Sequence, residues 1–387
     1  MSEIKFPIYL DHHATTPLDK RVLDEMIPYF IEKFGNASSL DHTFGYEASV
    51  AVENAREKIA QGINARHDEI IFTSGATESN NIALIGTMQK YADRGNHLIT
   101  CVTEHKAVLD TARHLESLGN KVTYLSVNEY GEIDLDELKN SITEKTVMIS
   151  IMTANNEIGT ISDVEAIGKI AHENAVIFHT DAAQAVGHIP MDVQKMNIDL
   201  MSFSAHKMYG PKGIGALYVR GVKPRVKPDP LFYGGGQERN IRSGTLNVPG
   251  IVGFGKAMEI ALKEMNSENI RFKEWTDLML NEFEKVGGKL NGHPTNRLSH
   301  NLNVYFQGIE SKAIINSISK EIAISAGSAC TTQMVEPSHV LLSIGLTEDE
   351  SHFTIRVGFG RFNEKEEIEY VVEKISSTTI YLQKIKI

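Results

Sequence analysis

The stretch that decides the fold reads IDLMSFSAHK, residues 198–207, in which an apolar run ends just before Lys207. Residues 198–203 have the length and composition of a buried strand. Upstream, AVIFHT (175–180) is a second run of the same kind, and Asp181 follows it directly. Buried strands that end in polar residues predict a parallel sheet with its ligand site beyond the carboxyl ends of the strands.

A lysine just past one strand, with a carboxylate just past its neighbour, is the arrangement that a pyridoxal phosphate site requires. The lysine forms the Schiff base, and the acid keeps the pyridinium nitrogen protonated so that the ring accepts electrons. A lone lysine in a loop is usually only a surface residue. The interpretation of Lys207 and Asp181 therefore depends on the segments around them.

Strand-like runs alternate with helical patterns along most of the chain. The runs are 69–73, 97–103, 121–127, 146–153, 175–180, 198–203 and 215–219, and the helical patterns are 78–91, 106–118, 134–141 and 163–174. This alternation predicts an α/β fold with right-handed crossovers and a mostly parallel sheet.

The pattern changes after the three glycines at 234–236. A long helical stretch, 248–283, precedes a strand at 302–306, a helix, another short strand and a final amphipathic helix. We therefore expect a large α/β domain over 15–260. A smaller α+β domain would comprise 1–14 together with 261–387.

Composition excludes several classes of protein. Of 387 residues, 41% are hydrophobic and 23% charged, which is ordinary globular usage. A net charge of −11 without a long basic run argues against direct nucleic-acid binding. The two cysteines, Cys101 and Cys330, form no CxxC pair, which argues against a disulfide scaffold or a cysteine-ligated zinc site. With neither an apolar signal core nor an apolar run of 18 residues, we expect a cytoplasmic protein without a membrane segment.

Other residues suited to a cofactor also follow predicted strands. TSGAT (73–77) opens a helix, whose free N–H groups favour a phosphate, although a plain helix cap explains the segment equally well. His105 follows the next strand, where it can stack on a ring and move protons or serve as a structural histidine. Further segments of this kind are NNEIG (155–159), Gln184, Ser204, His206 and RSGT (242–245).

Cys330 suggests the reaction. It lies in SAGSACTTQ (325–333), which contains no bulky apolar residue and is expected to be an exposed, mobile loop. An accessible thiol can act as a nucleophile once it is deprotonated. A tolerated small residue is the simpler alternative. Cys101 lies inside the apolar run 97–103, so we expect it to pack in the core.

These segments occur in an order that resembles a known family. The order is LDHHATTP (10–17), 74–78, 103–106, 155–159, 181–184, 204–207 with YGPKG (209–213), 242–245, and 325–331 with EPS (336–338). Together they resemble a cysteine desulfurase of the NifS/IscS type, in the class V aminotransferase superfamily of pyridoxal-phosphate enzymes with fold type I. The resemblance runs from Tyr9 to about Phe362, and the length of 327–337 is similar to that of members with a flexible cysteine loop.

The resemblance implies roles around the cofactor. Lys207 would hold pyridoxal 5′-phosphate and move the α-proton of the substrate, and Asp181 would sustain the electron sink. His105 would stack on the ring and assist proton transfer, and Gln184 would bind the ring oxygen. The residues that would hold the phosphate are Ala76, Thr77, Ser204 and His206.

The resemblance also implies roles in substrate binding and sulfur transfer. Asn156, next to the cofactor, and Arg356 would hold the carboxylate of L-cysteine, Arg356 by a two-pronged hydrogen bond. The Cys330 thiolate would attack the substrate sulfur, which leaves a persulfide on the protein and releases L-alanine. Thr245 would reach the phosphate of the other subunit, which implies a homodimer.

The sulfur would pass to an acceptor protein such as an iron–sulfur scaffold or a tRNA-thiolation protein. Scaffold-binding members carry a tail after the last helix, whereas this sequence stops at KIKI (384–387), so the resemblance does not extend to docking through such a tail. The pair His12-His13 replaces more usual residues, and it lacks the spacing of a metal site.

Two other classes of function use part of the same residue set. A selenocysteine lyase or another class V aminotransferase-type enzyme needs the cofactor residues without Cys330. A non-catalytic sulfur carrier needs Cys330 without the Lys207–Asp181 pair. The sequence contains both sets, which favours the desulfurase.

Overall fold

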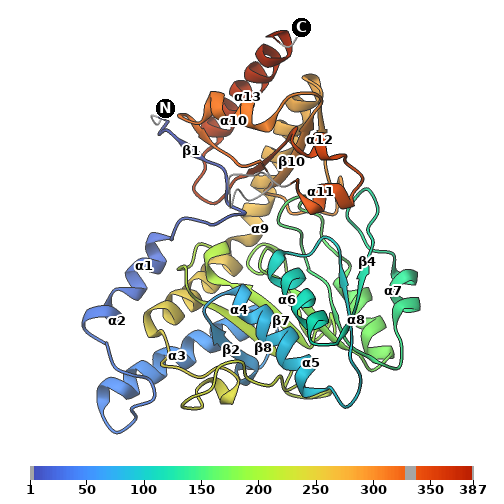
Figure 1. The fold of residues 1–387 in the computed structure, drawn as a ribbon. Helices are drawn as coiled ribbons and strands as arrows, with labels where there is room; N and C mark the ends of the chain where they lie inside the picture. The colour runs from blue at the N-terminus through green and yellow to red at the C-terminus, as the bar shows by residue number, and fades with distance from the viewer. Residues whose placement is uncertain (1–3, 327–336, 386–387) are drawn as a thin grey trace.

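The computed structural model describes residues 4–326 and 337–385. Its main sheet has seven strands in the order β2-β8-β7-β6-β5-β3-β4 (Figure 1). They are β2 (Ile70–Thr73), β3 (His97–Cys101), β4 (Lys121–Leu125), β5 (Thr146–Ser150), β6 (Ile177–Asp181), β7 (Leu200–Ser204) and β8 (Gly215–Val219). The strands from β7 to β4 are parallel, which confirms the predicted α/β fold. β8 is antiparallel to both of its neighbours, because the short link from β7 leaves no room for a crossover helix.

The predicted helices of this sheet are also present. They are α6 (Lys106–Ser117), α7 (Leu135–Ser141) and α8 (Val164–Glu173). Asp134 and Asp163 cap α7 and α8 by accepting backbone N–H groups, as helix starts prefer. The predicted helix over 78–91 is a continuous segment of α4 (Ala76–Asn81), a π-helical turn η2 (Ile82–Gly86) and α5 (Thr87–Lys90).

No helix was predicted before residue 69, but three α-helices lie in the described residues of that region. They are α1 (Lys20–Met26), α2 (Pro28–Ile31) and α3 (Thr43–Gly62). α3 buries small side chains, including Ala51 and Ala55, against the long helix α9 (Val248–Lys285). A Cβ atom on Gly255 of α9 would lie 2.7 Å from the Cα atom of Ala55, so the two helices pack very closely.

Helix α9 connects the two parts of the molecule. Its first half, through Ala261, packs into the core beneath the seven-stranded sheet. Its second half, from Phe272 to Phe283, packs into a separate hydrophobic cluster. In Figure 1, α9 continues from the lower part into the upper part, near which both chain termini lie. We propose that the predicted domain boundary near residue 260 falls within this helix.

The upper part is built on a small antiparallel sheet. β10 (Asn301–Phe306) pairs with β9 (Gly288–Leu290) and β12 (Thr354–Gly358). β1 (Ile8–Tyr9) pairs in parallel with β11 (Ile322–Ala323), so Ile8 and Leu10 join the same cluster as the C-terminal residues. The helices here are α10 (Ser311–Ile318), α11 (His339–Ser343), α12 (Glu348–Ser351) and α13 (Lys365–Ile385). Among the described residues, no helix combines the length and apolar character needed to cross a membrane.

Candidate active site

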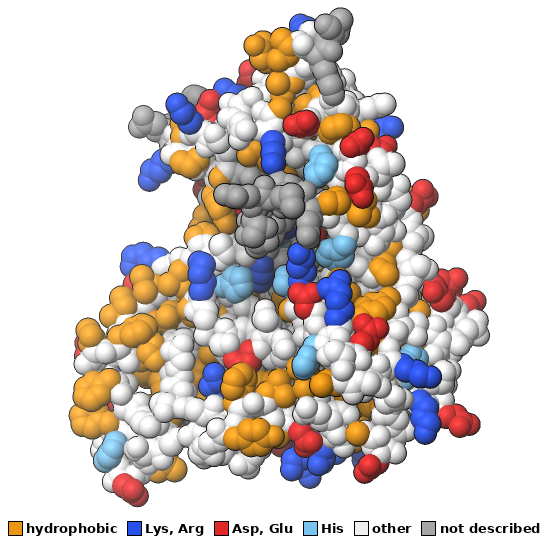
Figure 2. All heavy atoms as spheres, in the orientation of Figure 1, with side chains coloured by type: hydrophobic (Ala, Val, Ile, Leu, Met, Phe, Trp, Pro, Cys, Tyr) orange, Lys and Arg blue, Asp and Glu red, His pale blue; other side chains and the backbone are white. Residues whose placement is uncertain are grey.

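A cavity of about 1960 Å³ lies where the carboxyl ends of the parallel strands face the upper part of the molecule. Lys, Arg and His side chains gather near the middle of the face of the molecule that Figure 2 shows. The predicted site residues that line the cavity are Ala76, Thr77, His105, Asn156, Asp181, Gln184, Ser204, His206, Lys207 and Arg356. Thr245 is exposed and does not line it. Cys330 lies outside the described residues.

Lys207 follows β7 in a short 3₁₀ turn, with its side chain in the cavity. Its Nζ atom donates hydrogen bonds to the backbone carbonyls of His13 and, at 2.8 Å, Ala14. Burial, assisted by the positive charge of Arg356, lowers the pKa of the Lys207 amine to about 8. A lysine with such a pKa is partly neutral near pH 8 and is therefore able to attack a carbonyl carbon.

Asp181 ends β6 at the same edge of the sheet. Its Oδ1 atom accepts the N–H of Ala183 at 2.9 Å, and its Oδ2 atom accepts from Asn80 Nδ2 at 2.7 Å. Asn80 on α4 was not foreseen, because its distance from Asp181 in the sequence hides the contact. These two donors fix the orientation of a buried carboxylate beside the cavity.

The start of α4 has backbone donors that no side chain of the described residues caps. Gly75 precedes the helix with φ +153°, and Ser204 Oγ lies 4.0 Å from the position of a Cβ atom on this glycine. Nearby, Glu78 accepts the N–H of Ser74 at 2.7 Å and pairs with Arg242 at 2.8 Å. Arg242 is therefore engaged by Glu78, while the helix start itself offers N–H groups to an anion.

The two predicted histidines differ in their surroundings. His206 Nδ1 lies 3.1 Å from Thr15 Oγ1, and burial together with nearby Lys207 lowers its pKa to about 4. His105 caps α6, where its Nδ1 atom accepts the N–H of Ala107 at 3.1 Å. The neutral form of His105 therefore carries its proton on Nε2, and the residue lines the cavity.

Arg356 lies on β12 and reaches the side of the cavity that the large sheet forms. Its guanidinium donates to Asp11 Oδ1 at 2.8 Å and to the backbone oxygen of Asn156 at 3.1 Å. Its Nε atom is buried and has no hydrogen-bond partner among the described residues. Next to it, Glu157 accepts from Ser338 Oγ at 2.5 Å, and burial raises the pKa of Glu157 to about 7. No individual role was predicted from the sequence for Asp11, Glu157 or Ser338.

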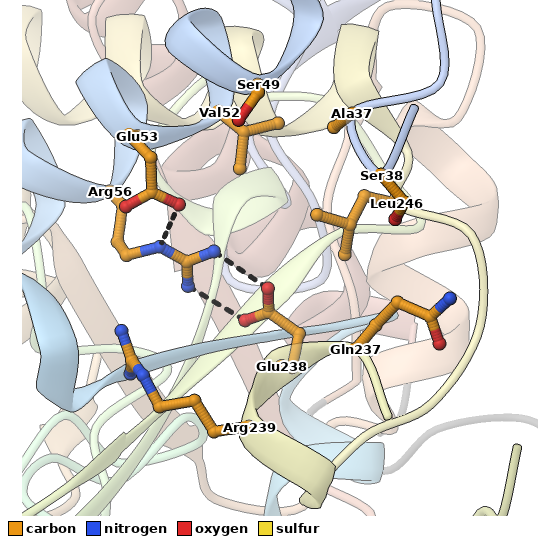
Figure 3. Close-up of a pocket in the computed structure, with 10 residues that line it drawn as sticks. All are labelled: Ala37, Ser38, Ser49, Val52, Glu53, Arg56, Gln237, Glu238, Arg239 and Leu246. Atoms are coloured by element: carbon orange, nitrogen blue, oxygen red, sulfur yellow. Dashed lines mark hydrogen bonds and ion pairs between the residues drawn. The ribbon is translucent and has the colours of Figure 1, made fainter. Parts of the chain in front are cut away.

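A smaller cavity of about 250 Å³ lies against α3 (Figure 3). In it, the guanidinium of Arg56 donates to both carboxylate oxygens of Glu238, at 2.7 and 2.8 Å. Glu238 begins a turn of three residues with positive φ that leads toward the predicted Thr245. Because the pair is buried and mutually satisfied, we assign this cavity a structural role.

Residues 8–371 match the family described as aminotransferase class-V. The cysteine desulfurase IscS of Rickettsia africae is 52% identical over 379 residues, covering 97% of this chain and 92% of the relative. This chain belongs to the cysteine desulfurase family. The IscS of Ehrlichia chaffeensis is 51% identical over 378 residues, with the same coverage.

Solved structures agree with this assignment. A NifS-like protein superimposes with a TM-score of 0.91 at 38% identity, with 97% of this chain and 100% of that chain covered. A structure described as SspA in complex with cysteine has a TM-score of 0.81 at 40% identity, with 91% of this chain and 98% of that chain covered. The enzyme thus has the fold of pyridoxal-phosphate enzymes of fold type I, and its cofactor is pyridoxal 5′-phosphate.

The residues of this chain fit that cofactor. A lysine whose amine has a lowered pKa, an oriented carboxylate and an uncapped helix start line one cavity. These groups match the aldehyde, the ring nitrogen and the phosphate of the cofactor in chemistry. Gln184 uses one amide hydrogen for the backbone oxygen of His13 at 3.0 Å, which leaves the other available to a ring oxygen.

Proposed function

We propose that this cysteine desulfurase holds its cofactor through Lys207 and transfers the sulfur of L-cysteine to Cys330. The observation that carries the cofactor part is the Lys207 amine, which has a lowered pKa and shares a cavity with Asp181. When bound, pyridoxal phosphate supplies an electron sink for the charge that develops on the substrate. Lys207 moves the α-proton, and His105 assists through its protonated Nε2 atom.

The cofactor's phosphate belongs, in this proposal, at the start of α4. The N–H groups of Ala76 and Thr77 supply donors there. The hydroxyl of Ser204, which donates to the backbone oxygen of Ile214 over a long 3.4 Å, is a further donor once it turns to the phosphate. His206 is neutral at physiological pH, because its pKa is lowered to about 4, and it donates a hydrogen bond without adding charge. Asp181, held by Asn80, would be the acidic partner of the ring nitrogen.

The substrate carboxylate belongs beside Arg356 and Asn156. The guanidinium of Arg356 lines the cavity and has five N–H donors, and its contacts with the described residues use only two of them. Further N–H groups therefore remain for a two-pronged contact with a carboxylate. Asp11 already binds the other side of the guanidinium and keeps its plane oriented toward Asn156. This arrangement favours a substrate with a free carboxylate.

The sulfur acceptor is assigned to Cys330 by contrast with the other cysteine. Cys101 is buried, and burial raises the pKa of its thiol to about 12, so it does not supply a thiolate. The chain has only these two cysteines. The Cys330 thiolate bonds to the substrate sulfur as the carbon–sulfur bond breaks, and protonation of the remaining carbon skeleton yields L-alanine. A reaction that depends on a free thiolate suits a reducing compartment, and we include a cytoplasmic location in the proposal.

We also include a homodimer and a sulfur-acceptor protein in the proposal. Large apolar side chains are exposed on α2 and its flanking residues, at the start of α3 and in a distant loop, namely Ile27, Phe30, Ile31, Phe34, Phe44, Tyr46, Phe232 and Tyr233. A monomer rarely leaves so much apolar surface in water, which supports a second copy as its cover. Thr245 is exposed outside its own cavity, as a residue that contacts the partner's phosphate would be. The persulfide would pass to an acceptor such as an iron–sulfur scaffold or a tRNA-thiolation protein.

Three variants test the chemistry. Lys207→Ala should lose the visible absorbance of the bound cofactor. Cys330→Ala should keep this absorbance but form no protein persulfide from L-cysteine, whereas the matched control Cys101→Ala should form it normally. Release of alanine and sulfide by Cys330→Ala at the parental rate would refute the assignment of the nucleophile. Turnover of selenocysteine alone would instead support a selenocysteine lyase.

A further inference from the structure

Three buried histidines from distant parts of the sequence form a stacked column beside Lys207. The rings of His13 and His300 lie 4.7 Å apart with an interplanar angle of 22°, and those of His188 and His300 lie 4.3 Å apart at 27°. His13 follows β1, His188 follows β6, and His300 directly precedes β10. The column therefore connects the N-terminal segment, the large sheet and the upper part of the molecule.

One end of the column holds the main chain of Lys207. His188 Nε2 lies 2.8 Å from the backbone oxygen of Lys207. Because a carbonyl oxygen only accepts, the proton of the neutral His188 ring is on Nε2. The backbone oxygen of His188 in turn accepts from Asn269 of α9 at 2.7 Å, which fixes this end to the long helix.

The other end holds the side chain of Lys207. The Nζ atom donates to the backbone oxygen of His13, and Gln184 Nε2 donates to the same oxygen at 3.0 Å. His13 Nδ1 lies 3.1 Å from Gln184 Oε1. His13 and Gln184 thus form a closed pair of hydrogen bonds directly behind the amine of Lys207.

His300 in the middle contributes mainly the faces of its ring. Its Nδ1 atom is buried and has no hydrogen-bond partner among the described residues. Its ring also packs against Phe272, with centroids 5.9 Å apart. Burial lowers the pKa of the three histidines, so the column is uncharged at physiological pH and stacks without repulsion.

We propose that His13, His188 and His300 are positioning residues that hold Lys207 at both ends. His188 holds the backbone carbonyl of Lys207 through its ring, and His13 holds the amine of Lys207 through its backbone oxygen. The inference builds on the proposed role of Lys207. Holding a reacting group in one orientation contributes strongly to rate, and a displacement of about 1 Å can cost about 100-fold. The column supplies this orientation through contacts that cross between both parts of the molecule.

Paired substitutions test the two kinds of contact. His300→Ala removes the central ring, whereas His300→Phe keeps a ring with two faces. His188→Leu removes the donor to Lys207, whereas His188→Gln keeps a donor. We expect His300→Ala and His188→Leu to lower kcat by about 10- to 100-fold, with KM for L-cysteine within about threefold of the parental value. The conservative variants should recover most of kcat.

A second measurement follows Lys207 directly. The pH midpoint of the visible absorbance of the bound cofactor reports the protonation equilibrium at the Lys207 nitrogen, and a positioning role predicts a shifted midpoint in the two disruptive variants. In the apo-enzyme, the pH dependence of Lys207 labelling by an amine reagent, followed by peptide mass spectrometry, should shift as well. His97→Asn is the matched control, because His97 is a buried histidine bound to Thr146 and Thr123 at the opposite end of the strands.

The outcomes separate this inference from the proposed function. Lys207→Ala that keeps the visible absorbance would overturn the proposed function and the inference with it. If the parental enzyme is coloured but the His188→Leu variant keeps the parental kcat and both pH midpoints, only the inference is overturned. Changes equal to those of His97→Asn would also overturn it, because they would reflect a general loss of packing. If His300→Ala does not fold, the two His188 variants decide the question.

Discussion

The buried ion pair between Arg56 and Glu238 leads to a prediction about stability. Their side chains are only 5% and 2% exposed, and the guanidinium meets both carboxylate oxygens. Arg56 also donates to the backbone oxygen of Ile70 at 2.7 Å, and its guanidinium lies 4.6 Å from the ring centre of Phe72. We consider the substitution Arg56→Met, which keeps much of the volume and removes the charge.

The magnitude follows from what the substitution leaves behind. Of the donors that the described part of the chain offers to its buried carboxylate, Glu238 would keep the N–H of Phe72, at 2.7 Å. Removal of one partner from a buried pair costs about 3–5 kcal/mol, because the other charge stays buried without compensation. The free energy of unfolding should therefore fall by about this amount.

Urea unfolding at a fixed protein concentration measures this change. Glu53→Gln is the matched control, because Glu53 also contacts Arg56, at 3.1 Å, but is 52% exposed. Its loss should cost less than about 1 kcal/mol. The double variant Arg56→Met/Glu238→Leu should recover part of the stability, because it removes the uncompensated charge. A loss below about 1 kcal/mol for Arg56→Met, or a double variant weaker than the single one, would refute the reasoning.

Three further predictions concern the main cavity. Arg356→Lys keeps a positive charge but loses the planar fork. Because a hydrogen bond to a charged group contributes about 1.5–3 kcal/mol, kcat/KM for L-cysteine should fall by about 10- to 100-fold. Steady-state alanine production measures this value, and a change within twofold would contradict the proposed carboxylate site. In the apo-enzyme, labelling of Lys207 by an amine reagent should rise to half its maximal rate near pH 8, because burial lowers its pKa to about 8; a midpoint above pH 10 would show that the amine is not buried in solution. Burial raises the folded-state pKa of Glu157 to about 7. Between about pH 4.5 and 7, the folded protein therefore binds more protons than the unfolded chain. This group makes the free energy of unfolding fall as pH rises through that window. Thermal unfolding of Glu157→Gln across this range should lack that component, and an unchanged pH dependence would contradict it.

Much of the main sheet was predictable because it depends on local pattern. Each of its strands is a short apolar run, and buried parallel strands need no partner-specific sequence to be recognised. Helix α3 was missed because its buried face is built largely of alanine and glycine, whose weak hydrophobic periodicity reveals little. The antiparallel direction of β8 follows from the short link between Ser204 and Gly215, which the alternation of strands and helices does not reveal.

The sequence by itself determined the chemistry available at the carboxyl edge of the sheet. Lys207, Asp181 and the small residues before α4 follow predicted strands, and parallel strands bring their ends to one edge whatever the detailed packing. Only the tertiary structure decided which of the remaining polar groups meet there. Arg356 reaches Asp11 across 345 positions, and the three stacked histidines come from segments more than a hundred residues apart. Such contacts depend on how the two parts pack against each other, and no periodicity in the sequence predicts them.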